Sequence, residues 1–373
     1  MQRFPGTLGI TRIIAVTGTP LSVPLREPFV IATGRLDATR AVLVSVTLED
    51  ETGRRAEGLG EAAALPPVTH EDQPDLLRLI EAARSRLTGH AFADLEAGEA
   101  AVAAALPESA VARAGVAAAV ADAWARLAGV PLYVALGGAS PPAALETDIT
   151  LPIGDAAYVG ALAASYRAAG FTCFKVKVGR DFEADHAALR AVAAAVPDAR
   201  FRLDANAGFT ARQALTLHDR VVGDGLVLEC FEQPCARDDL VGMAEVAARA
   251  SVPVVADESF RGAEDLERLC VARAATAVNL KLAKLGGPVA AVALGRAARA
   301  RGLALMAGAM VETRVGIATM AHVVAALGGV DWVDLDTAFL LAGDPFVGGY
   351  AASGARLTLD GRAGTGVERA RAP

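Results

Sequence analysis

The second half of the chain repeats one pattern, a short apolar run that ends in a charged residue. Six of these runs end in Lys177, Asp204, Glu232, Asp257, Lys281 and Asp334. The charges recur at intervals of roughly 25 residues, which is about one strand and one helix. The last interval is about double, and the apolar stretch Leu303–Ala307 provides the missing strand. Buried strands that each end in a charge indicate one site assembled from many strands.

The segments between these runs have the periodicity of amphipathic helices. Apolar strands that alternate with helices predict a parallel sheet buried on both faces. From Thr147–Leu151 to Val333–Leu335 we expect eight strands, and hence a (β/α)8 or TIM barrel. Active sites in such barrels lie at the C-terminal ends of the strands, where these charges fall. For Asp204 or Asp257 taken alone, helix capping is about as good an explanation as a role in an active site. It does not explain all six charges together.

The first part of the chain predicts an α+β module. Alternating segments typical of antiparallel strands occupy Ile10–Leu25, Arg40–Glu49 and Gly58–Ala63. Three helices are expected over Glu71–Leu87, Asp94–Ala105 and Ser109–Ala128. We therefore expect this module over residues 1–135 and the barrel over 136–345. A C-terminal segment, 346–373, should return to the first module through a strand at Ala355–Leu359.

Composition excludes several classes of function. The net charge is −7, the pI is about 5.4 and no basic block is present, so we expect neither a nucleic-acid partner nor binding to an anionic membrane. No apolar run has the length of a membrane helix. Four dispersed cysteines and an N-terminus without a signal-peptide pattern predict reduced thiols and a cytoplasmic protein.

The strand numbers place the charges around the ring. Lys177 falls on strand 2 and Lys281 on strand 6, so the two lysines should face each other across the barrel. Between them, strands 3, 4 and 5 carry Asp204, Glu232 and Asp257. Three neighbouring carboxylates need a compensating cation, and Mg²⁺ suits such a hard-oxygen pocket with positions open for substrate. Salt bridges from these acids to nearby lysines are the simpler alternative.

Two opposed lysines beside a cation indicate proton transfer at both faces of one carbon, with the cation stabilising an enolate. Lys175 shares a side of its strand with Lys177, so its charge is expected to lower the pKa of Lys177. Asp334 and Asp336 also share a side, across from the metal, and suit a positively charged substrate group. Either aspartate could instead cap the following segment. The inferred substrate has a carboxylate at one end and an ammonium at the other.

These residues resemble the enolase superfamily, and within it the muconate-lactonizing subgroup. The resemblance covers nearly the whole chain and rests on Lys175-Val-Lys177, Asp204-Ala-Asn206, Glu232-Gln-Pro234, Asp257-Glu-Ser259 and Asn279-Leu-Lys281-Leu-Ala-Lys284. It implies a modified (β/α)7β barrel with an N-terminal α+β capping domain that the C-terminal tail completes. Substrate would be enclosed between the two. A lysine base with Mg²⁺ is a known property of this superfamily.

The pair Asp334-Leu-Asp336 narrows the resemblance, because it is similar to the Asp-x-Asp with which dipeptide epimerases hold the substrate α-ammonium. The resemblance implies that Lys177 and Lys281 exchange the α-proton of the C-terminal residue of an L-Xaa-L-Xaa dipeptide. The carboxylate of that residue would bind one Mg²⁺ per subunit at the three acids of strands 3 to 5. Lys281 rather than Lys284 would be catalytic, and Lys284 is expected to start a helix.

Side-chain preference should rest on two capping-domain loops, at about Pro28–Arg40 and Ala62–Val68. Epimerases that act on Ala-Glu place a cation in the first loop, and Arg35 lies near that place. Phe29 and Ile31 would suit an apolar side chain instead, and Asp37 a cationic one. The sequence leaves this choice open.

Two other functions stay open. A cycloisomerase or an o-succinylbenzoate synthase-type lyase on the same scaffold would use one lysine as base and the other as a stabilising cation, with no ammonium to bind. A non-catalytic binding protein that kept the barrel is the third hypothesis, and the complete set of acids and lysines speaks against it. The resemblance also implies a homo-oligomer.

Overall fold

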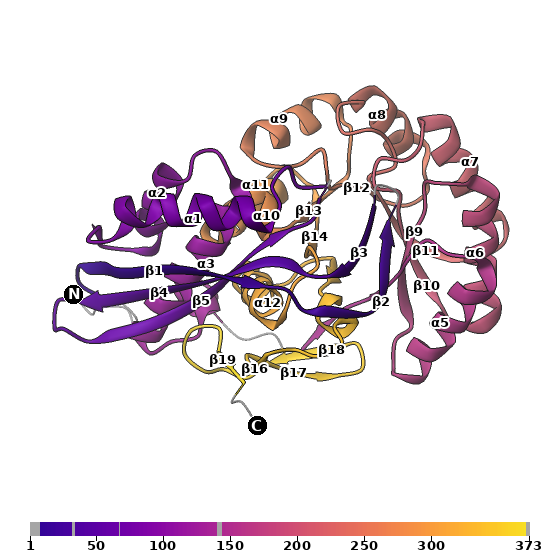
Figure 1. Cartoon of the computed structure of the whole chain (residues 1–373). Coiled ribbons are helices and arrows are strands. Elements are labelled where there is room, and N and C mark those ends of the chain that lie inside the picture. The colour runs from indigo at the N-terminus through magenta and orange to yellow at the C-terminus, as the bar shows by residue number, and fades with distance from the viewer. Residues whose placement is uncertain (1–7, 32–33, 67, 140–143, 371–373) are drawn as a thin grey trace.

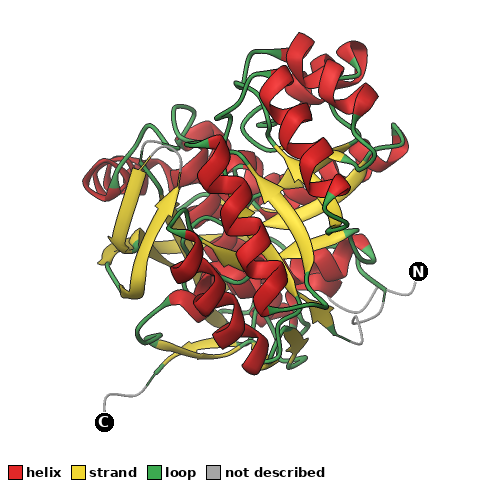
Figure 2. Cartoon of the chain, turned by 90° about the vertical axis from the view of Figure 1, so that its right-hand side faces the viewer, coloured by secondary structure: helices red, strands yellow, loops and turns green. Residues whose placement is uncertain are grey.

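The computed structural model describes residues 8–31, 34–66, 68–139 and 144–370 of the chain. Two bodies can be followed in Figure 1: a barrel with helices around it, and an antiparallel sheet with helices that extends to one side. Viewed from the side in Figure 2, helices cover the outside of the barrel and its strands lie behind them. No helix within the described residues is long and apolar enough to cross a membrane.

The first body is an antiparallel sheet covered by helices. Its strand order is β5-β4-β1-β6, formed by Arg55–Ala64, Arg40–Asp50, Thr11–Leu21 and Ala91–Phe92. The helices are α1 (Gln73–Leu87), α2 (Leu95–Ala105) and α3 (Ala110–Ala128), and a short helix, α4 (Leu132–Ala135), follows them. The alanine-rich α3 lies directly on β5: a Cβ added to Gly60 would be 2.0 Å from the carbonyl oxygen of Gly115. Small residues on both elements therefore permit this close contact.

A β-hairpin occupies the region expected to be the first capping-domain loop. Its strands, β2 (Pro24–Ile31) and β3 (Gly34–Ala38), pair with each other outside the main sheet. Figure 1 shows this hairpin, in indigo, beside the barrel strands. It is attached to the barrel domain by Arg26, whose Nε donates a 2.8 Å hydrogen bond to the carbonyl oxygen of Leu341.

The barrel contains eight parallel strands in sequence order. They are β8 (Ile149–Leu151), β9 (Cys173–Lys177), β10 (Arg200–Asp204), β11 (Val227–Glu232), β12 (Val254–Ala256), β13 (Ala277–Leu280), β14 (Ala304–Gly308) and β15 (Trp332–Asp334). A parallel bridge between Thr147 and Val333 joins the last strand to the first. The predicted barrel, including its unmarked seventh strand, is confirmed.

Helices connect the barrel strands. They are α5 (Ala156–Ala168), α6 (Phe182–Ala195), α7 (Ala211–Gly223), α8 (Leu240–Arg249), α9 (Ala263–Ala272), α10 (Leu282–Leu285), α11 (Pro288–Ala300) and α12 (Arg314–Leu327). After β15 comes only a 3₁₀ turn, η1 (Thr337–Leu340). The architecture is therefore (β/α)7β with a capping domain, as the resemblance implied.

The C-terminal segment forms small antiparallel ladders. Its strands are β16 (Phe346–Gly348), β17 (Tyr350–Ser353), β18 (Arg356–Leu359) and β19 (Val367–Arg369). The strand expected to return to the first module, β18, pairs with β17 and with β7 (Leu145–Glu146), which directly precedes the barrel. Contact with the capping domain comes later in the chain, where the backbone N–H of Thr365 donates a 2.6 Å hydrogen bond to Asp122 of α3.

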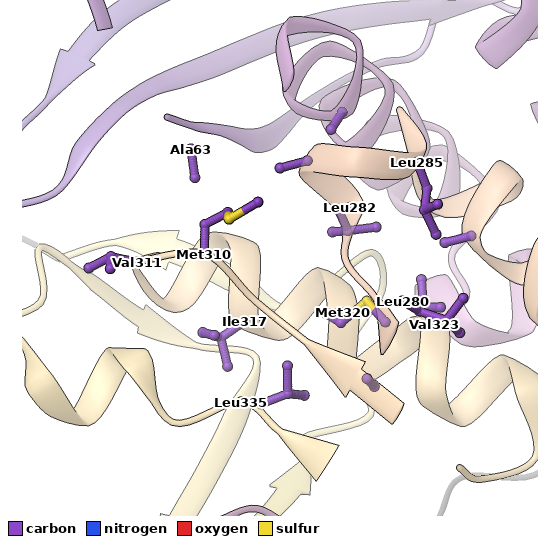
Figure 3. Packing of buried hydrophobic residues seen from close by; sticks show 14 of the residues in the cluster. Ala63, Leu280, Leu282, Leu285, Met310, Val311, Ile317, Met320, Val323 and Leu335 are labelled. Carbon is purple, nitrogen blue, oxygen red and sulfur yellow. The ribbon is translucent and has the colours of Figure 1, made fainter. Parts of the chain in front are cut away.

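Apolar packing joins the capping domain to the barrel. Figure 3 shows Ala63 of β5 pointing toward Met310, which follows β14. Met310 and Val311 are 3% and 1% exposed, so the loop after β14 is buried against the capping domain. This loop also borders the charged strand ends, which brings the capping domain directly over them.

Candidate active site

The charged strand ends meet at the C-terminal end of the barrel, where Lys177, Asp257, Lys281 and Asp334 line one cavity and Asp204 and Glu232 lie beneath it. Strand register places Asp204 opposite both Lys177 and Glu232. Asp257 and Lys281 directly follow β12 and β13, at the same edge of the sheet. The cavity is lined by charged residues of the barrel and by apolar residues of the capping domain and the loop after β14.

The two lysines predicted to face each other come from opposite strands of the ring and line the same cavity. Lys177 and Lys281 are 8% and 5% exposed. Lys177 Nζ lies 2.6 Å from Asp204 Oδ2, and Lys281 Nζ lies 2.8 Å from Asp257 Oδ2. Burial alone would lower the pKa of Lys281, but the charges of Asp257 and Glu232 outweigh burial and raise it.

Lys175 lies between two groups of acids. Its Nζ is 3.0 Å from Asp204, 2.7 Å from Glu232 and 2.7 Å from Asp334. Burial acts against its charge, but these carboxylates hold its pKa well above the usual value. Lys175, whose charge was expected to act on Lys177, is thus itself paired with three carboxylates.

The three acids of strands 3 to 5 are all buried, and each lies close to a lysine, as the simpler alternative expected. Burial would raise the pKa of Asp204, but Lys175 and Lys177 hold it well below the usual range. Burial and the neighbouring Asp204 raise the pKa of Glu232. Glu232 therefore remains the acid least compensated by positive charge.

Unpartnered oxygens beside these acids fit a hard cation. Glu232 Oε2 is buried outside hydrogen-bond geometry, although Lys175 Nζ is 2.7 Å away. The side-chain oxygen of Asn206 is also buried without a hydrogen-bond partner. Carboxylate and amide oxygens are the ligand types that Mg²⁺ accepts, so the donor set is chemically suited to this ion.

Gln233 links the strand ends that carry Glu232 and Asp257, a contact that sequence reasoning missed. Its Oε1 accepts hydrogen bonds from the backbone N–H groups of Asp257 (2.9 Å) and Ser259 (3.1 Å). Its own φ is +34°, a conformation that non-glycine residues rarely adopt. Strained backbone of this kind concentrates at functional sites. The motif Glu-Gln-Pro contained the residue, but nothing in its spacing indicated the contact.

Lys284 also takes part in the site. It was expected to start a helix but is the third residue of the four-residue α10, which begins at Leu282, and it is 9% exposed. Its Nζ donates to the carbonyl oxygens of Asp257 (2.7 Å) and Asn279 (3.0 Å) and to the Asp257 carboxylate. The spacing of three residues from Lys281 was the available signal, since it places both lysines near the same strand end.

The predicted pair of aspartates lines the cavity on the side of strand 8. Asp334 accepts a 2.7 Å hydrogen bond from Lys175, and Asp336 accepts one of 2.5 Å from the backbone N–H of Thr150. Asp336 precedes η1, but its side chain makes no capping hydrogen bond there, so the capping alternative is wrong for this residue. Burial and the charge of Asp334 raise the pKa of Asp336 to about 7.

A third acid, Asp148, joins this pair and was not anticipated. Carboxylate oxygens of Asp148, Asp334 and Asp336 lie within 4.8 Å of one another, which makes them the one group of described residues compact enough to suggest a metal site on distance alone. Asp148 is fully buried and accepts a 2.8 Å hydrogen bond from Arg202. An acid immediately before the first barrel strand was the signal in the sequence.

The hairpin brings Phe29 to the cavity but not Arg35. Phe29 is 8% exposed, and its ring centroid is 5.9 Å from Lys177 Nζ. It pairs with Leu36 across the hairpin, whereas Arg35 pairs with Val30 on the other face. Arg35 is exposed and forms a 2.9 Å ion pair with Asp37. The suggested binding role of Arg35 therefore has no support in this geometry.

The remaining capping-domain candidate, Ile31, ends β2, and its side chain lies outside the described part of the structure. The second predicted loop contributes Leu65 and Val68 to the cavity wall, and the loop after β14 adds three more apolar residues, Ala309, Met310 and Val311. Together with Phe29 they form an apolar wall over the charged strand ends.

Comparison with known proteins agrees with this geometry. A family model described as enolase C-terminal domain-like matches residues 158–372. The chain is 38% identical to an aromatic dipeptide epimerase of Herpetosiphon aurantiacus, over 96% of this chain and 99% of the relative. Its structure is similar to a substrate-liganded L-Ala-D/L-Glu epimerase from Bacillus subtilis, with a TM-score of 0.91, 32% identity, and coverage of 97% and 100% of the two chains.

A dipeptide epimerase from Enterococcus faecalis, solved with Mg and the dipeptide L-Leu-L-Tyr, is also similar, with a TM-score of 0.87, 30% identity, and coverage of 96% of this chain and 100% of that one. Fold and site together define an enzyme of the enolase superfamily. Within it, the chain belongs to the dipeptide epimerase family.

Proposed function

We propose that this protein is a Mg²⁺-dependent dipeptide epimerase that inverts the α-carbon of the C-terminal residue. The observation that carries the proposal is the placement of Lys177 and Lys281 on opposite strands around one cavity. Removing a proton from one face of a carbon and returning it to the other requires two such groups. Two acidic groups complete the site: the acids of strands 3 to 5 suit a metal cation, and the aspartates of strand 8 suit an ammonium.

The strand positions orient a dipeptide in this cavity. Its carboxylate would lie toward the acids of strands 3 to 5, and its ammonium toward Asp334 and Asp336 on the far side. The reacting carbon then lies between Lys177 and Lys281. One lysine takes the α-proton, and the other, which enters protonated, delivers a proton to the opposite face. Atoms balance, because the substrate loses one proton and gains one.

Asp204, Glu232 and Asp257 would hold the Mg²⁺ ion. Bound there, the ion supplies positive charge for the carboxylate of the substrate and for the negative charge that develops when the α-carbon loses its proton. Lys281 acts as a base only when neutral, and Asp257 and Glu232 now favour its charged form. A Mg²⁺ ion would neutralise the charge of those two carboxylates. The charged form of Lys281 would then be favoured less, so that Lys281 would lose and regain its proton more easily.

The same geometry supports a preference for an apolar C-terminal side chain. The deprotonated carbon is planar, with one lysine on each face. Within the plane, the carboxylate and the amide point toward opposite sides of the barrel, so the side chain points along the barrel axis. Lys175 fills the barrel side, and the apolar wall of Phe29, Val68 and Met310 closes the other. The aromatic specificity named for one relative and the L-Leu-L-Tyr ligand of another are in line with this.

Deuterium exchange in D₂O tests the function. Wild-type protein with Mg²⁺ should convert L-Ala-L-Phe to its epimer with deuterium at the α-carbon of the phenylalanine. Lys177→Ala and Lys281→Ala should each abolish epimerisation, while each variant keeps exchange on one configuration, opposite for the two. Normal epimerisation by Lys281→Ala would contradict the two-base mechanism.

The lyase or cycloisomerase alternative makes a different prediction. Those reactions need no ammonium site, so turnover of an amine-free diacid that Asp334→Asn leaves unchanged would favour them. We further propose that the enzyme works in the cytoplasm, which its four free cysteines support, and as a homo-oligomer, which light scattering would test.

A further inference from the structure

Three carboxylates form a buried cluster between strands 1 and 8. Asp148, Asp334 and Asp336 are 0%, 5% and 0% exposed, and their oxygens lie within 4.8 Å of one another. Asp334 and Asp336 line the cavity, whereas Asp148 lies behind them and does not. Like charges this close are costly unless cations compensate them.

The available cations compensate this group only in part. Arg202 donates to Asp148 at 2.8 Å, but the same guanidinium also donates to Glu229 at 2.8 Å. Lys175 reaches Asp334, but it also contacts two acids of the opposite group. Asp336 receives a backbone N–H and no ion pair among the described residues. The group is therefore short of positive charge, and burial together with the neighbouring carboxylates raises the pKa of both Asp148 and Asp336.

Unpartnered oxygens in this group indicate a ligand that donates hydrogen bonds. Asp148 Oδ1 and Asp336 Oδ1 are both buried without a hydrogen-bond partner. Buried polar atoms normally have partners, and two free carboxylate oxygens in one acidic group suit a cationic N–H donor. The buried ion pair Asp122–Arg126 differs from this acidic group, because both carboxylate oxygens of Asp122 accept hydrogen bonds.

We propose that Asp148 is a third carboxylate of the substrate-ammonium site, acting as a positioning residue from beneath Asp334 and Asp336. The inference rests on the proposed function. Its ion pair with Arg202 anchors Asp148 to β10, and an ammonium bound at Asp334 and Asp336 would favour the charged form of Asp148, which then adds to the attraction for that ammonium. The ligand is a primary ammonium, since the cavity that Asp334 and Asp336 line is the one proposed to hold the dipeptide.

Paired ligands that differ only in charge test this role. L-Ala-Gly and N-acetyl-L-Ala-Gly share their shape around the reacting carbon, but only the first carries an ammonium. Asp148→Asn should weaken competitive inhibition by L-Ala-Gly by roughly tenfold or more, as expected for loss of one close charge. Inhibition by the acetylated ligand should stay within about twofold. The control is Asp122→Asn, which alters a buried aspartate that is also paired with an arginine but lies elsewhere. It should change inhibition by neither ligand.

Each outcome has a distinct meaning. Equal weakening of both ligands by Asp148→Asn, or no weakening at all, would overturn the proposal. A drop in bound Mg²⁺ per chain in equilibrium dialysis would overturn it in favour of a metal site at these acids. If Asp148→Asn does not fold, Asp148→Asn combined with Arg202→Gln removes both charges and carries the same expectation. Absence of epimerisation by wild type would instead reject the proposed function itself.

Discussion

The side chain of Gln233 links the ends of two strands, β11 and β12, that carry expected metal ligands. It follows Glu232 and holds the backbone of Asp257 and Ser259, so the positions of two expected metal ligands depend on one amide. Outer partners of metal ligands typically contribute 10- to 100-fold to metal affinity or activity.

We therefore expect Gln233→Ala to weaken Mg²⁺ binding by roughly 10- to 100-fold and to lower kcat/KM similarly. Isothermal titration with Mg²⁺ and an epimerisation assay check this. Gln213→Ala, a glutamine exposed in the capping box of α7, is the matched control and should keep wild-type affinity. Unaltered Mg²⁺ affinity in Gln233→Ala would show that the strand ends hold their geometry without it.

Sequence reasoning identified the residues at the strand ends because the C-terminal ends of parallel barrel strands converge. It did not find their partners. Gln233, Lys284 and Asp148 act through side-chain directions and hydrogen bonds that depend on neighbouring strands. Residue spacing along one strand determines its facing side but not these contacts across the barrel.

At the scale of elements, the β2–β3 hairpin decides which capping residues reach the substrate. Its register places Phe29 and Leu36 on the cavity face and Arg35 on the solvent face. A shift of one residue would exchange the two faces, so sequence position alone could not choose between Phe29 and Arg35. Pro24 and Pro28 also weaken the strand signal there.

This arrangement predicts opposite results for two hairpin variants. Phe29→Ala removes a buried ring from the apolar wall, so kcat/KM for L-Ala-L-Phe should fall by roughly 10- to 100-fold, as for loss of a large apolar contact. Arg35→Ala should leave kcat/KM for both L-Ala-L-Phe and L-Ala-L-Glu unchanged. A selective loss of L-Ala-L-Glu activity in Arg35→Ala would mean that the arginine reaches the substrate after all.

At the scale of the whole molecule, buried acids join the two domains. Glu61 of the capping domain accepts hydrogen bonds from the backbone N–H groups of Thr313 and Gly316, at the start of α12. Burial and the charge of Glu312 raise the pKa of Glu61 to about 8. Burial raises the pKa of Glu312 to about 7. Both acids thus favour their protonated forms in the folded protein.

Stability should consequently fall as pH rises. The contribution of a raised carboxyl pKa is complete below the unfolded value of about 4.3 and is lost as pH passes the folded pKa. Each tenfold difference in acid dissociation constant between the folded and unfolded states corresponds to about 1.4 kcal/mol. Between pH 5 and 9 we expect a decrease of a few kcal/mol, measured by urea unfolding. Glu312→Gln should reduce this decrease, because it removes one titrating acid and the like charge beside Glu61.

The control for this prediction is Glu264→Gln, an exposed acid at the start of α9, which should keep the wild-type pH dependence. Glu312→Gln should not abolish the dependence, since burial also raises the pKa of Glu99 to about 7. An unchanged slope in Glu312→Gln would show that Glu312 does not titrate in this range.

The fold class itself was largely predictable, because strand and helix periodicities are local properties of the sequence. The contacts between domains were not. Glu61 and Thr313 are 252 residues apart, and no local pattern links them.

That separation matters while the chain is being made. At a synthesis rate of about 5 to 20 residues per second, the start of α12 is made on the order of tens of seconds after Glu61. The capping sheet can fold early, since β1, β4 and β5 are close in sequence. The cavity cannot close until the end of translation. For most of its synthesis, a nascent chain therefore exposes the apolar residues of the capping domain that later pack on the barrel, and such exposed surface is prone to aggregation.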